Sequence, residues 1–319
     1  MDKPLVSVLI PVYNAGNYLR ASLQSILDQT YRDLEIIIID DGSTDNCIES
    51  ITDIKDSRIR IFSQQNYGRA AAMNRGLDEL SGDFYIAQDA DDISYPCRVQ
   101  HQLQYITENL DLAAVFVSHD LIIRGKIMAP RFASKNIQQC REDIANFRMP
   151  GIGATAMYRM SLVSKVHFEQ DLKVGEDVDY VLRIGECHPM FVLGECLYSY
   201  RIHPKSSTRQ SAAMNQLMTQ KVIKRACQRR GSELSEYQPD RIVIDIKRGY
   251  KRWEADVVPH FMESVLDLCR AAKIKKALTT ASECVWLNPF DPYFYKPLFY
   301  FIAPLGLIKY YRYLKAKHG

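Results

Sequence analysis

Three acidic clusters, each following an apolar segment, are the residues of this chain whose types and spacing could carry chemistry. In chain order they are Asp40 with Asp41, Asp89 with Asp91 and Asp92, and Glu176 with Asp177. A single acidic cluster is commonly a turn or a helix cap. Three of them indicate a shared site, because the strand ends of an open α/β sheet converge on one crevice where ligands bind.

The central cluster has the spacing of a metal site. Asp89 and Asp91 follow an apolar segment at residues 84–87, and residues two apart in an extended stretch point the same way. Both carboxylates could therefore face one cation. Mg²⁺ and Mn²⁺ take carboxylate oxygens together with substrate phosphate oxygens, and a metal so held would neutralise a departing diphosphate.

The elements that must position these residues alternate between strand and helix signals over the first 110 residues. Apolar runs predict buried strands, and apolar residues at helical spacing predict the helices between them. The expected strands are residues 6–10, 34–39, 58–62 and 84–87, and the expected helices are residues 18–27, 68–80 and 96–108. This alternation predicts an α/β fold with a mixed, mostly parallel central sheet flanked by helices.

The pattern changes after residue 110. An amphipathic helix is expected at residues 177–187, and from about residue 211 the chain is mainly helical. The expected strands of this part are residues 112–118 and 121–127 as a pair, then 154–158, 191–193 and 196–200.

Net charge also divides the chain. Residues 1–204 carry 20 basic and 28 acidic side chains, a net charge of −8, whereas residues 205–319 carry 21 basic and 10 acidic ones, a net charge of +11. The acidic part suits a divalent cation, and the basic part suggests a membrane surface, nucleic acid or a neighbouring acidic domain as partner. We expect a catalytic domain over residues 1–207, with halves at 1–110 and 111–207, and a helical region over 208–319.

Cysteine usage and the N-terminal residues bear on location. The eight cysteines are scattered, with no Cys-x-x-Cys pair, which argues against a zinc module and a disulfide framework and favours a reducing cytoplasm. The apolar run at the N-terminus has six residues and lacks the pattern of a secretory signal.

Several motifs, in order and at characteristic spacing, resemble those of a known family. They are VSVLIPVYN at residues 6–14, IDDGSTD at 39–45, NYGRAAAMNRG at 66–76, QDADD at 88–92, Glu176-Asp177, and YRIHPKSS at 200–207. Together they resemble the signatures of family-2 glycosyltransferases, which have the GT-A nucleotide-diphospho-sugar transferase fold. The resemblance covers roughly residues 4–207, and no single motif would carry it.

The resemblance implies a nucleotide-sugar site built from the first motifs. The turn after the first strand would line the nucleoside pocket, and Asp41, with Asp40 as second choice, would accept a hydrogen bond from the uracil ring. Gly68 would allow close approach, and Arg69 would contact the base or the diphosphate. The implied nucleotide-binding residues are Pro11, Val12, Tyr13, Asn14, Asp41, Arg69, Asp89 and Ala90.

The resemblance also implies a metal and a catalytic base. Asp91 would be the main ligand of Mn²⁺ or Mg²⁺, and the implied metal-binding set is Asp91, Asp89, Asp92 and His203. The family inverts anomeric configuration, which requires a single displacement in which a carboxylate deprotonates the acceptor hydroxyl. Asp177 is the expected base, with Glu176 second. Two alternatives stay open: these carboxylates could cap a helix, and His203 could be a hydrogen-bonded loop residue.

Two departures from the family pattern bear on function. Gln88 precedes the aspartates where an apolar residue is commoner, and we expect this to change little in the metal site. The Gln-x-x-Arg-Trp string of processive members is absent, because position 249, three residues before Arg252-Trp253, is Gly. That absence favours transfer of one sugar per encounter.

We therefore expect an inverting, metal-dependent glycosyltransferase that moves a sugar from a nucleotide-diphosphate donor to a saccharide or lipid-linked acceptor. The expected donor is a UDP-sugar, and the expected process is bacterial surface polysaccharide synthesis. The alternatives are a sugar-nucleotide nucleotidyltransferase, whose Gly-rich pyrophosphate loop is missing, and a non-catalytic nucleotide-sugar-binding relative. The sequence lacks a GxGxxG motif after the first strand, which argues against a dinucleotide-binding oxidoreductase. It also lacks a stacking or recognition motif of the kind found in nucleic-acid-binding proteins.

The C-terminal residues 293–319 are aromatic and basic. They are too short and too broken by proline for a spanning helix of about 20 apolar residues. Two interpretations stay open: an interfacial element resting on anionic lipid at the inner face of the cell membrane, and a helix whose aromatic residues pack on the catalytic domain.

Overall fold

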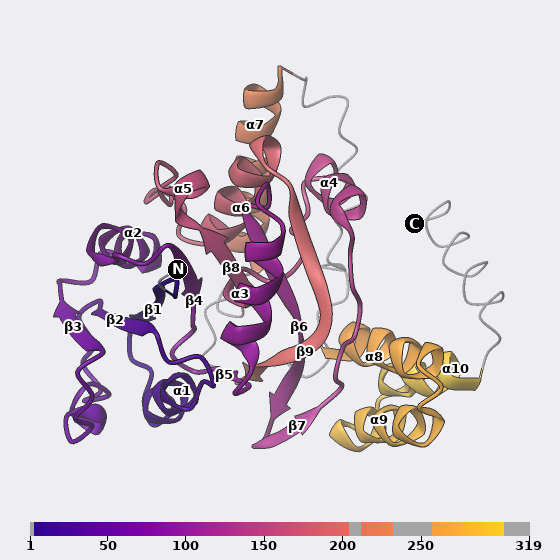
Figure 1. Cartoon of the computed structure of the whole chain (residues 1–319). Coiled ribbons are helices and arrows are strands. Elements are labelled where there is room, and N and C mark those ends of the chain that lie inside the picture. Colours follow the sequence, from indigo (N-terminus) through magenta and orange to yellow (C-terminus); the bar gives the residue numbers. More distant parts are fainter. Residues whose placement is uncertain (1–2, 204–211, 232–256, 303–319) are drawn as a thin grey trace.

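The computed structural model describes residues 3–203, 212–231 and 257–302 (Figure 1). Within these residues nine strands form one mixed sheet, in the order β3-β2-β1-β4-β8-β6-β9-β5, with β7 paired to β6. The strands are β1 (Val6–Val12), β2 (Leu34–Asp40), β3 (Ile59–Ser63), β4 (Phe84–Ala87), β5 (Ile93–Ser94), β6 (Ala114–Ile123), β7 (Lys126–Met128), β8 (Ala156–Arg159) and β9 (Met190–Ile202).

Helices cover both faces of this sheet. They are α1 (Tyr18–Leu27), α2 (Arg69–Glu79), α3 (Arg98–Glu108), α4 (Ile137–Ala145), α5 (Met160–Val163), α6 (Glu176–Cys187), α7 (Ala212–Arg230), α8 (Val258–Arg270), α9 (Ile274–Leu287) and α10 (Lys296–Ile302). The α/β fold with a mixed central sheet flanked by helices and a helical C-terminal region, expected from the sequence, is confirmed.

The first half shows why strand ends meet at one edge. β1 pairs in parallel with β2 and β4, and β2 pairs in parallel with β3. Val6, Val8 and Ile10 of β1 pack in the core beneath α1 and α3, whereas Leu9 packs in the core beneath α2. Burial on both faces explains the continuous apolar run of this strand. A Cβ on Gly76 would lie 2.0 Å from Leu9 Cδ1, so α2 can cross β1 closely only with glycine there.

The expected strand pair at residues 112–118 and 121–127 is wrong. β6 is one strand of ten residues, and the short strand β7 turns back onto its end. The polar residues Ser118, His119 and Asp120 resemble a turn in the sequence. They remain in the strand because a register shift against β9 on either side of Ser118 accommodates them.

The two closing strands expected at residues 191–193 and 196–200 are also one element. β9 runs for thirteen residues beside β6, and the two strands are parallel. Gly194 lies between the two expected strands and has a packing role, because a Cβ there would lie 3.0 Å from the carbonyl oxygen of Phe132.

The C-terminal helices α8, α9 and α10 pack on one another and on the far ends of β6 and β9. Phe261, Cys284 and Phe294 share a buried cluster with Leu121 and Ile202 of the sheet. Figure 1 shows these helices beside β7 and β9. The expected domain boundary at residue 207 lies outside the described residues. None of the helices in the described ranges has both the length and the apolar character needed to cross a bilayer.

Candidate active site

The turn after β2 is held by its own carboxylates. Asp41 is buried and accepts hydrogen bonds from the backbone N–H groups of Tyr67 (3.0 Å) and Gly68 (2.8 Å) and from Gln64 Nε2 (2.7 Å). Asp40 accepts from the N–H of Ser43. Asp41 therefore links the IDDGSTD motif to the NYGRA motif through hydrogen bonds. Its contact with a uracil ring stays a prediction.

Gly68 is required by its backbone conformation. Its φ of 91° lies in the region that favours glycine, and a Cβ there would meet no atom within 4 Å. The conformation lets the chain turn sharply into α2. As a result Arg69, the first residue of that helix, lies at the start of the cleft.

The turn after β1 is joined to the turn after β2. Asn14 Oδ1 accepts from the N–H of Thr44 at 2.8 Å, and the N–H of Asn14 donates to Ser43 Oγ at 3.1 Å. Tyr13, beside Asn14, is 54% exposed. Pro11, Val12, Tyr13 and Asn14 therefore belong to one wall with the Asp41 loop, as the motif order implied, and an aromatic ring is free at its rim.

The central turn presents Asp89 and Asp91 to opposite partners. Arg69 Nη2 donates to Asp89 Oδ1 at 2.6 Å. His203 Nε2 lies 2.7 Å from Asp91 Oδ2. The side chains of Asp89 and Asp91 are 25% and 29% exposed. Ala90 between them is buried. The structure therefore brings His203 to the acidic turn.

Asp92 differs from its two neighbours. It is completely buried, and it accepts hydrogen bonds from the hydroxyl of Tyr198 and from the N–H of Arg201, both at 2.7 Å. Burial, with the nearby charges of Asp91 and Asp89, raises the pKa of Asp92 well above its ordinary value. Because both oxygens already have protein donors, Asp92 fits a role in holding the turn against β9. Its metal contact stays a prediction.

Arg69 links the central turn to the third acidic cluster. Its guanidinium lies 2.6 Å from Asp89 and 3.3 Å from Glu176. Although burial lowers the pKa of Arg69, the carboxylates of Asp89, Glu176 and Asp177 hold it above the ordinary arginine value. The two clusters, expected only to share a cleft, are therefore joined by one cation.

Asp177 lies one residue into α6, half-buried. Its Oδ1 accepts from the N–H of Val178 at 2.8 Å. A Cβ on Gly153 would lie 3.5 Å from its Oδ2, so Gly153 leaves room in front of that oxygen. Burial raises the pKa of both Asp177 and Glu176, and the proximity of Asp177 raises the pKa of Glu176 further. A carboxyl with a raised pKa is a competent proton acceptor near neutral pH.

A small hollow of about 10 Å³, the space of a single water molecule, adjoins Asp177. Its lining includes Arg69, Gly153 and Asp177 together with the rings of Tyr158, Phe168 and Tyr180. Phe168 stacks on Tyr180 with ring centroids 4.0 Å apart. Asp177 therefore lies against a packed aromatic cluster.

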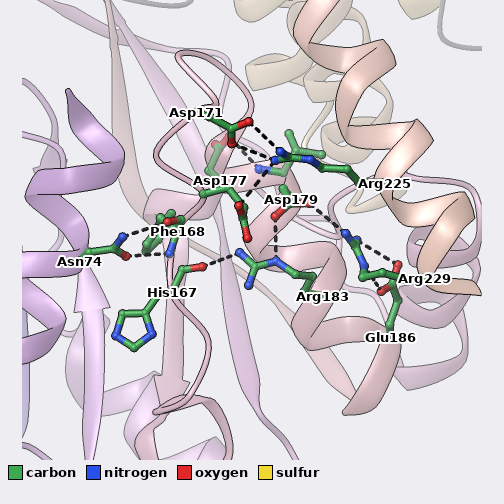
Figure 2. A network of polar contacts seen from close by, with 12 residues as sticks. Asn74, His167, Phe168, Asp171, Asp177, Asp179, Arg183, Glu186, Arg225 and Arg229 are labelled. Atoms are coloured by element: carbon green, nitrogen blue, oxygen red, sulfur yellow. Dashed lines mark hydrogen bonds and ion pairs between the residues drawn. The ribbon is translucent and has the colours of Figure 1, made fainter. Parts of the chain in front are cut away.

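Figure 2 shows what fixes the helix that carries Asp177. Asp179 is completely buried and pairs with Arg183 Nε (2.7 Å) and with Arg229 Nη1 of α7 (3.2 Å). Arg225 of α7 pairs with Asp171 (2.7 Å) in the loop before α6. The sequence analysis named a membrane surface, nucleic acid or a neighbouring acidic domain as partners of the basic C-terminal part. Arg225 and Arg229 of that part pair with acidic residues in the first part of the same chain.

Sequence reasoning missed Gln88 as a structural residue, and it missed Arg98 and Tyr198 entirely. All three side chains are completely buried next to the central turn. One signal was present: Arg98 and Gln102 fall on the same helical face as Val99 and Ile106, the face that packs on the sheet. Polar residues on a buried helix face need internal partners.

Within the described residues, no group of three or more His, Cys, Asp or Glu side chains is arranged to hold a metal ion.

Comparisons with known proteins agree with this geometry. The model of glycosyl transferase family 2 matches residues 7–166. An uncharacterized glycosyltransferase of Haemophilus influenzae is 31% identical over 76% of this chain and 77% of its own. Another, of Rickettsia typhi, is 30% identical over 67% of this chain and 68% of its own.

Solved structures share the fold. The crystal structure of S. aureus TarS 1–349 in complex with UDP-GlcNAc has a TM-score of 0.58 and 15% identity, covering 89% of this chain and 92% of TarS 1–349. The complex of the same protein with UDP has a TM-score of 0.54 at 16% identity, covering 89% and 92%. The resemblance carried by the sequence motifs is therefore confirmed, and the chain belongs to glycosyl transferase family 2.

Proposed function

We propose that this glycosyltransferase moves a sugar from a UDP-sugar to a hydroxyl of a saccharide or lipid-linked acceptor, with inversion at the anomeric carbon. The observation that carries the proposal is the arrangement of Asp89 and Asp91 at the end of β4, with Arg69 linking Asp89 to the Glu176-Asp177 pair. The UDP and UDP-GlcNAc complexes of the structurally similar TarS support the choice of donor.

Asp91 and His203 are the residues we propose as protein ligands of Mn²⁺ or Mg²⁺. One carboxylate and one imidazole lie 2.7 Å apart, both are partly exposed, and such ions use few protein ligands when substrate phosphates supply the rest. The metal, when bound, would neutralise charge on the diphosphate leaving group. Asp89, turned toward Arg69, would contact the ribose side of the donor.

Asp177 is the residue we propose as the general base. The acceptor hydroxyl would lose its proton to Asp177 Oδ2 as its oxygen forms the new bond to the anomeric carbon. The bond from that carbon to the diphosphate oxygen breaks in the same step, and the electron pair leaves with the diphosphate. Gly153 leaves room for the hydroxyl at this oxygen.

We also propose that the C-terminal helices rest on an anionic membrane surface. Tyr295, Phe299 and Ile302 lie at helical spacing and are exposed. Trp286 at the end of α9 is 78% exposed and Phe290 is 95% exposed. The exposed Lys275 and Lys276 lie in the first turn of α9, at its opposite end. Exposed apolar residues and lysines on one helix are typical of interfacial elements. Residues 303–319, the rest of the expected segment, lie outside the described residues.

The packing interpretation of the C-terminal residues also has support. Phe294 and Tyr300 are buried, and Phe294 belongs to the cluster that contacts β6. The packing interpretation therefore holds for Phe294 and Tyr300. Contact of the exposed side chains with lipid remains our proposal.

The experiment that tests the proposed activity is release of UDP from a panel of UDP-sugars, measured with and without Mn²⁺. We expect slow hydrolysis of one or a few UDP-sugars in the presence of Mn²⁺, faster when a saccharide acceptor is added. The same panel with GDP- and dTDP-sugars is the control for the nucleobase of the donor. Turnover confined to GDP- or dTDP-sugars would contradict the choice of donor, and pyrophosphate release from UTP and a sugar phosphate would indicate a nucleotidyltransferase.

A further inference from the structure

Arg98, the first residue of α3, is a buried cation whose direct hydrogen-bond acceptors are all neutral. Its side chain is completely buried. No carboxylate of the described residues forms a salt bridge with it. Its acceptors are Gln102 Oε1 (3.1 Å), Ser94 Oγ (2.9 Å), Gln88 Oε1 (3.3 Å) and the carbonyl oxygens of Ala154 (2.6 Å) and Ala87 (3.4 Å). Burial lowers the pKa of Arg98 to about 10, so the side chain is still charged at neutral pH.

A buried charge is costly unless a countercharge compensates it. Here the compensation runs through an aromatic ring. The guanidinium lies over the face of Tyr198, 4.8 Å from the ring centroid, and the hydroxyl of Tyr198 donates to the buried carboxylate of Asp92. The negative face of the ring attracts the cation. Arg98, Tyr198 and Asp92 thus form a row of guanidinium, ring and carboxyl group next to the central turn.

The same residues hold the central turn at both ends. The Tyr198 hydroxyl accepts from the N–H of Asp89 (3.4 Å) and donates to Asp92 Oδ2 (2.7 Å). Gln88 Nε2 donates to the carbonyl oxygen of Asp92 at 3.0 Å. Arg98 contacts the oxygen of that Gln88 amide. Gln88 therefore lies inside the turn, and the expectation that it changes little in the metal site stays a prediction.

We propose that Arg98 is a positioning residue of the donor site, which acts through Tyr198 and Gln88 to fix the turn so that Asp89 and Asp91 face the nucleotide diphosphate. This inference rests on the proposed function. Residues that orient metal ligands typically change metal affinity 10- to 100-fold when they are replaced. Without Arg98, the ring of Tyr198 and the amide of Gln88 lose the group that they pack against, and the turn that they hold must rearrange before it can bind.

The chain offers a matched control for a purely structural arginine. Arg159 of β8 also lies over an aromatic ring, that of Phe84 at 5.1 Å. It donates to the backbone carbonyl oxygens of Ile106, Leu112 and Asn109. It makes no contact with the central turn among the described residues. Arg159→Met should lower the melting temperature and leave donor binding unchanged.

The test compares Arg98→Met, Arg98→Lys, Tyr198→Phe and Arg159→Met with the wild-type chain. Affinity for Mn²⁺ in the presence of UDP is read from the free Mn²⁺ signal in electron paramagnetic resonance, and melting temperature is measured in parallel. We expect about 10- to 100-fold weaker Mn²⁺ binding for Arg98→Met and Tyr198→Phe, and a smaller loss for Arg98→Lys, which keeps the charge over the ring.

The outcomes separate the inference from the proposed function. If the wild-type chain binds Mn²⁺ equally with and without UDP, both fail. If it shows UDP-dependent Mn²⁺ binding and both Arg98→Met and Tyr198→Phe bind as Arg159→Met does, the inference alone is overturned. Should Arg98→Met not fold, Arg98→Lys and Tyr198→Phe decide together, and Mn²⁺ binding equal to that of Arg159→Met in both overturns the inference. A double variant whose loss is smaller than the product of the single losses would support action through Tyr198.

Discussion

The imidazole Nε2 of His203 lies 2.7 Å from Oδ2 of Asp91, so the residue that follows β9 meets the turn that follows β4. Two further contacts hold this junction. Tyr18, at the start of α1, has its ring centroid 5.2 Å from that of His203, and the guanidinium of Arg201 lies 4.7 Å from the same Tyr18 ring. The two residues that we propose as metal ligands are therefore adjacent.

Replacing His203 by Ala should weaken Mn²⁺-dependent binding of UDP by about tenfold, in the range expected when one metal-site contact is lost. Binding of UDP without metal should change little. Isothermal titration calorimetry with and without Mn²⁺ measures both. His101, which pairs with Glu195 at 2.6 Å on the surface, supplies the control variant His101→Ala. Equal Mn²⁺ dependence in His203→Ala and wild type would exclude His203 as a ligand.

Replacing Asp177 by Asn should lower the rate of transfer by about 10²- to 10⁴-fold, the usual contribution of a general base, and leave UDP-sugar affinity unchanged. The raised pKa of Asp177 adds a pH effect. The base is active only when ionised, so transfer should rise with pH through a pKa above that of an ordinary aspartate. Asp111→Asn, at an exposed aspartate, is the control. Transfer at the wild-type rate would rule Asp177 out.

The same Asp177→Asn variant should be more stable than the wild-type chain at pH 8. A carboxyl whose folded-state pKa is raised contributes stability at low pH and loses it as the pH rises through that pKa. The ionised Asp177 beside Glu176 therefore destabilises the fold at pH 8, and asparagine removes that charge. Melting temperatures from pH 4 to pH 8 should differ most at the alkaline end. A difference that grows as the pH falls would contradict this sign.

Adding a methyl group at Gly153 should impair catalysis more than donor binding. The new Cβ of Gly153→Ala would lie 3.3 Å from the Cβ of Asp177 and 3.5 Å from its Oδ2, in the space we assign to the acceptor hydroxyl. We expect transfer to fall about tenfold, since small misplacements at a reacting centre reduce rates strongly. UDP affinity serves as the internal control. Unchanged transfer would show that the acceptor approaches Asp177 from another side.

Polar replacement of Trp286 and Phe290 should release the protein from anionic vesicles. Both side chains are largely exposed and would lose apolar burial of about 25 cal/mol per Å² on leaving the interface. Sedimentation with phosphatidylglycerol vesicles measures binding, and Leu110→Ser, at another exposed apolar residue, is the control. The membrane proposal fails if the wild-type chain does not sediment, or if Trp286→Ser with Phe290→Ser sediments equally well.

The sequence predicted the first half of the fold well because strands there end at polar residues of the candidate site. β1, β2 and β4 are apolar runs that stop at Asn14, Asp40 and Asp89, and such boundaries are local signals. β6 and β9 were each divided in two, since Ser118 to Asp120 and Gly194 suggest turns until their partners across the sheet are known. Pairing between distant strands is not a local property.

The site was predicted as a set of motifs and not as a set of contacts. Their order suggested that Asp41, Asp89 and Asp177 share a cleft, but nothing local showed that Arg69 joins Asp89 to Glu176. Arg98 was missed for a different reason. A charged residue at the start of a helix normally faces solvent, and only the tertiary structure shows that the Arg98 guanidinium packs over the ring of Tyr198, whose hydroxyl donates to Asp92.

The central claim is that Asp91 belongs to a metal-dependent nucleotide-diphosphate site. Calorimetric titration of UDP into the wild-type chain, Asp91→Asn and the control Asp111→Asn, each with and without Mn²⁺, tests it most directly. We predict that Mn²⁺ tightens UDP binding at least tenfold in the wild-type chain and in Asp111→Asn, and has no effect in Asp91→Asn. Equal Mn²⁺-dependent tightening in Asp91→Asn, or binding of UDP that ignores Mn²⁺ in the wild-type chain, would contradict the claim.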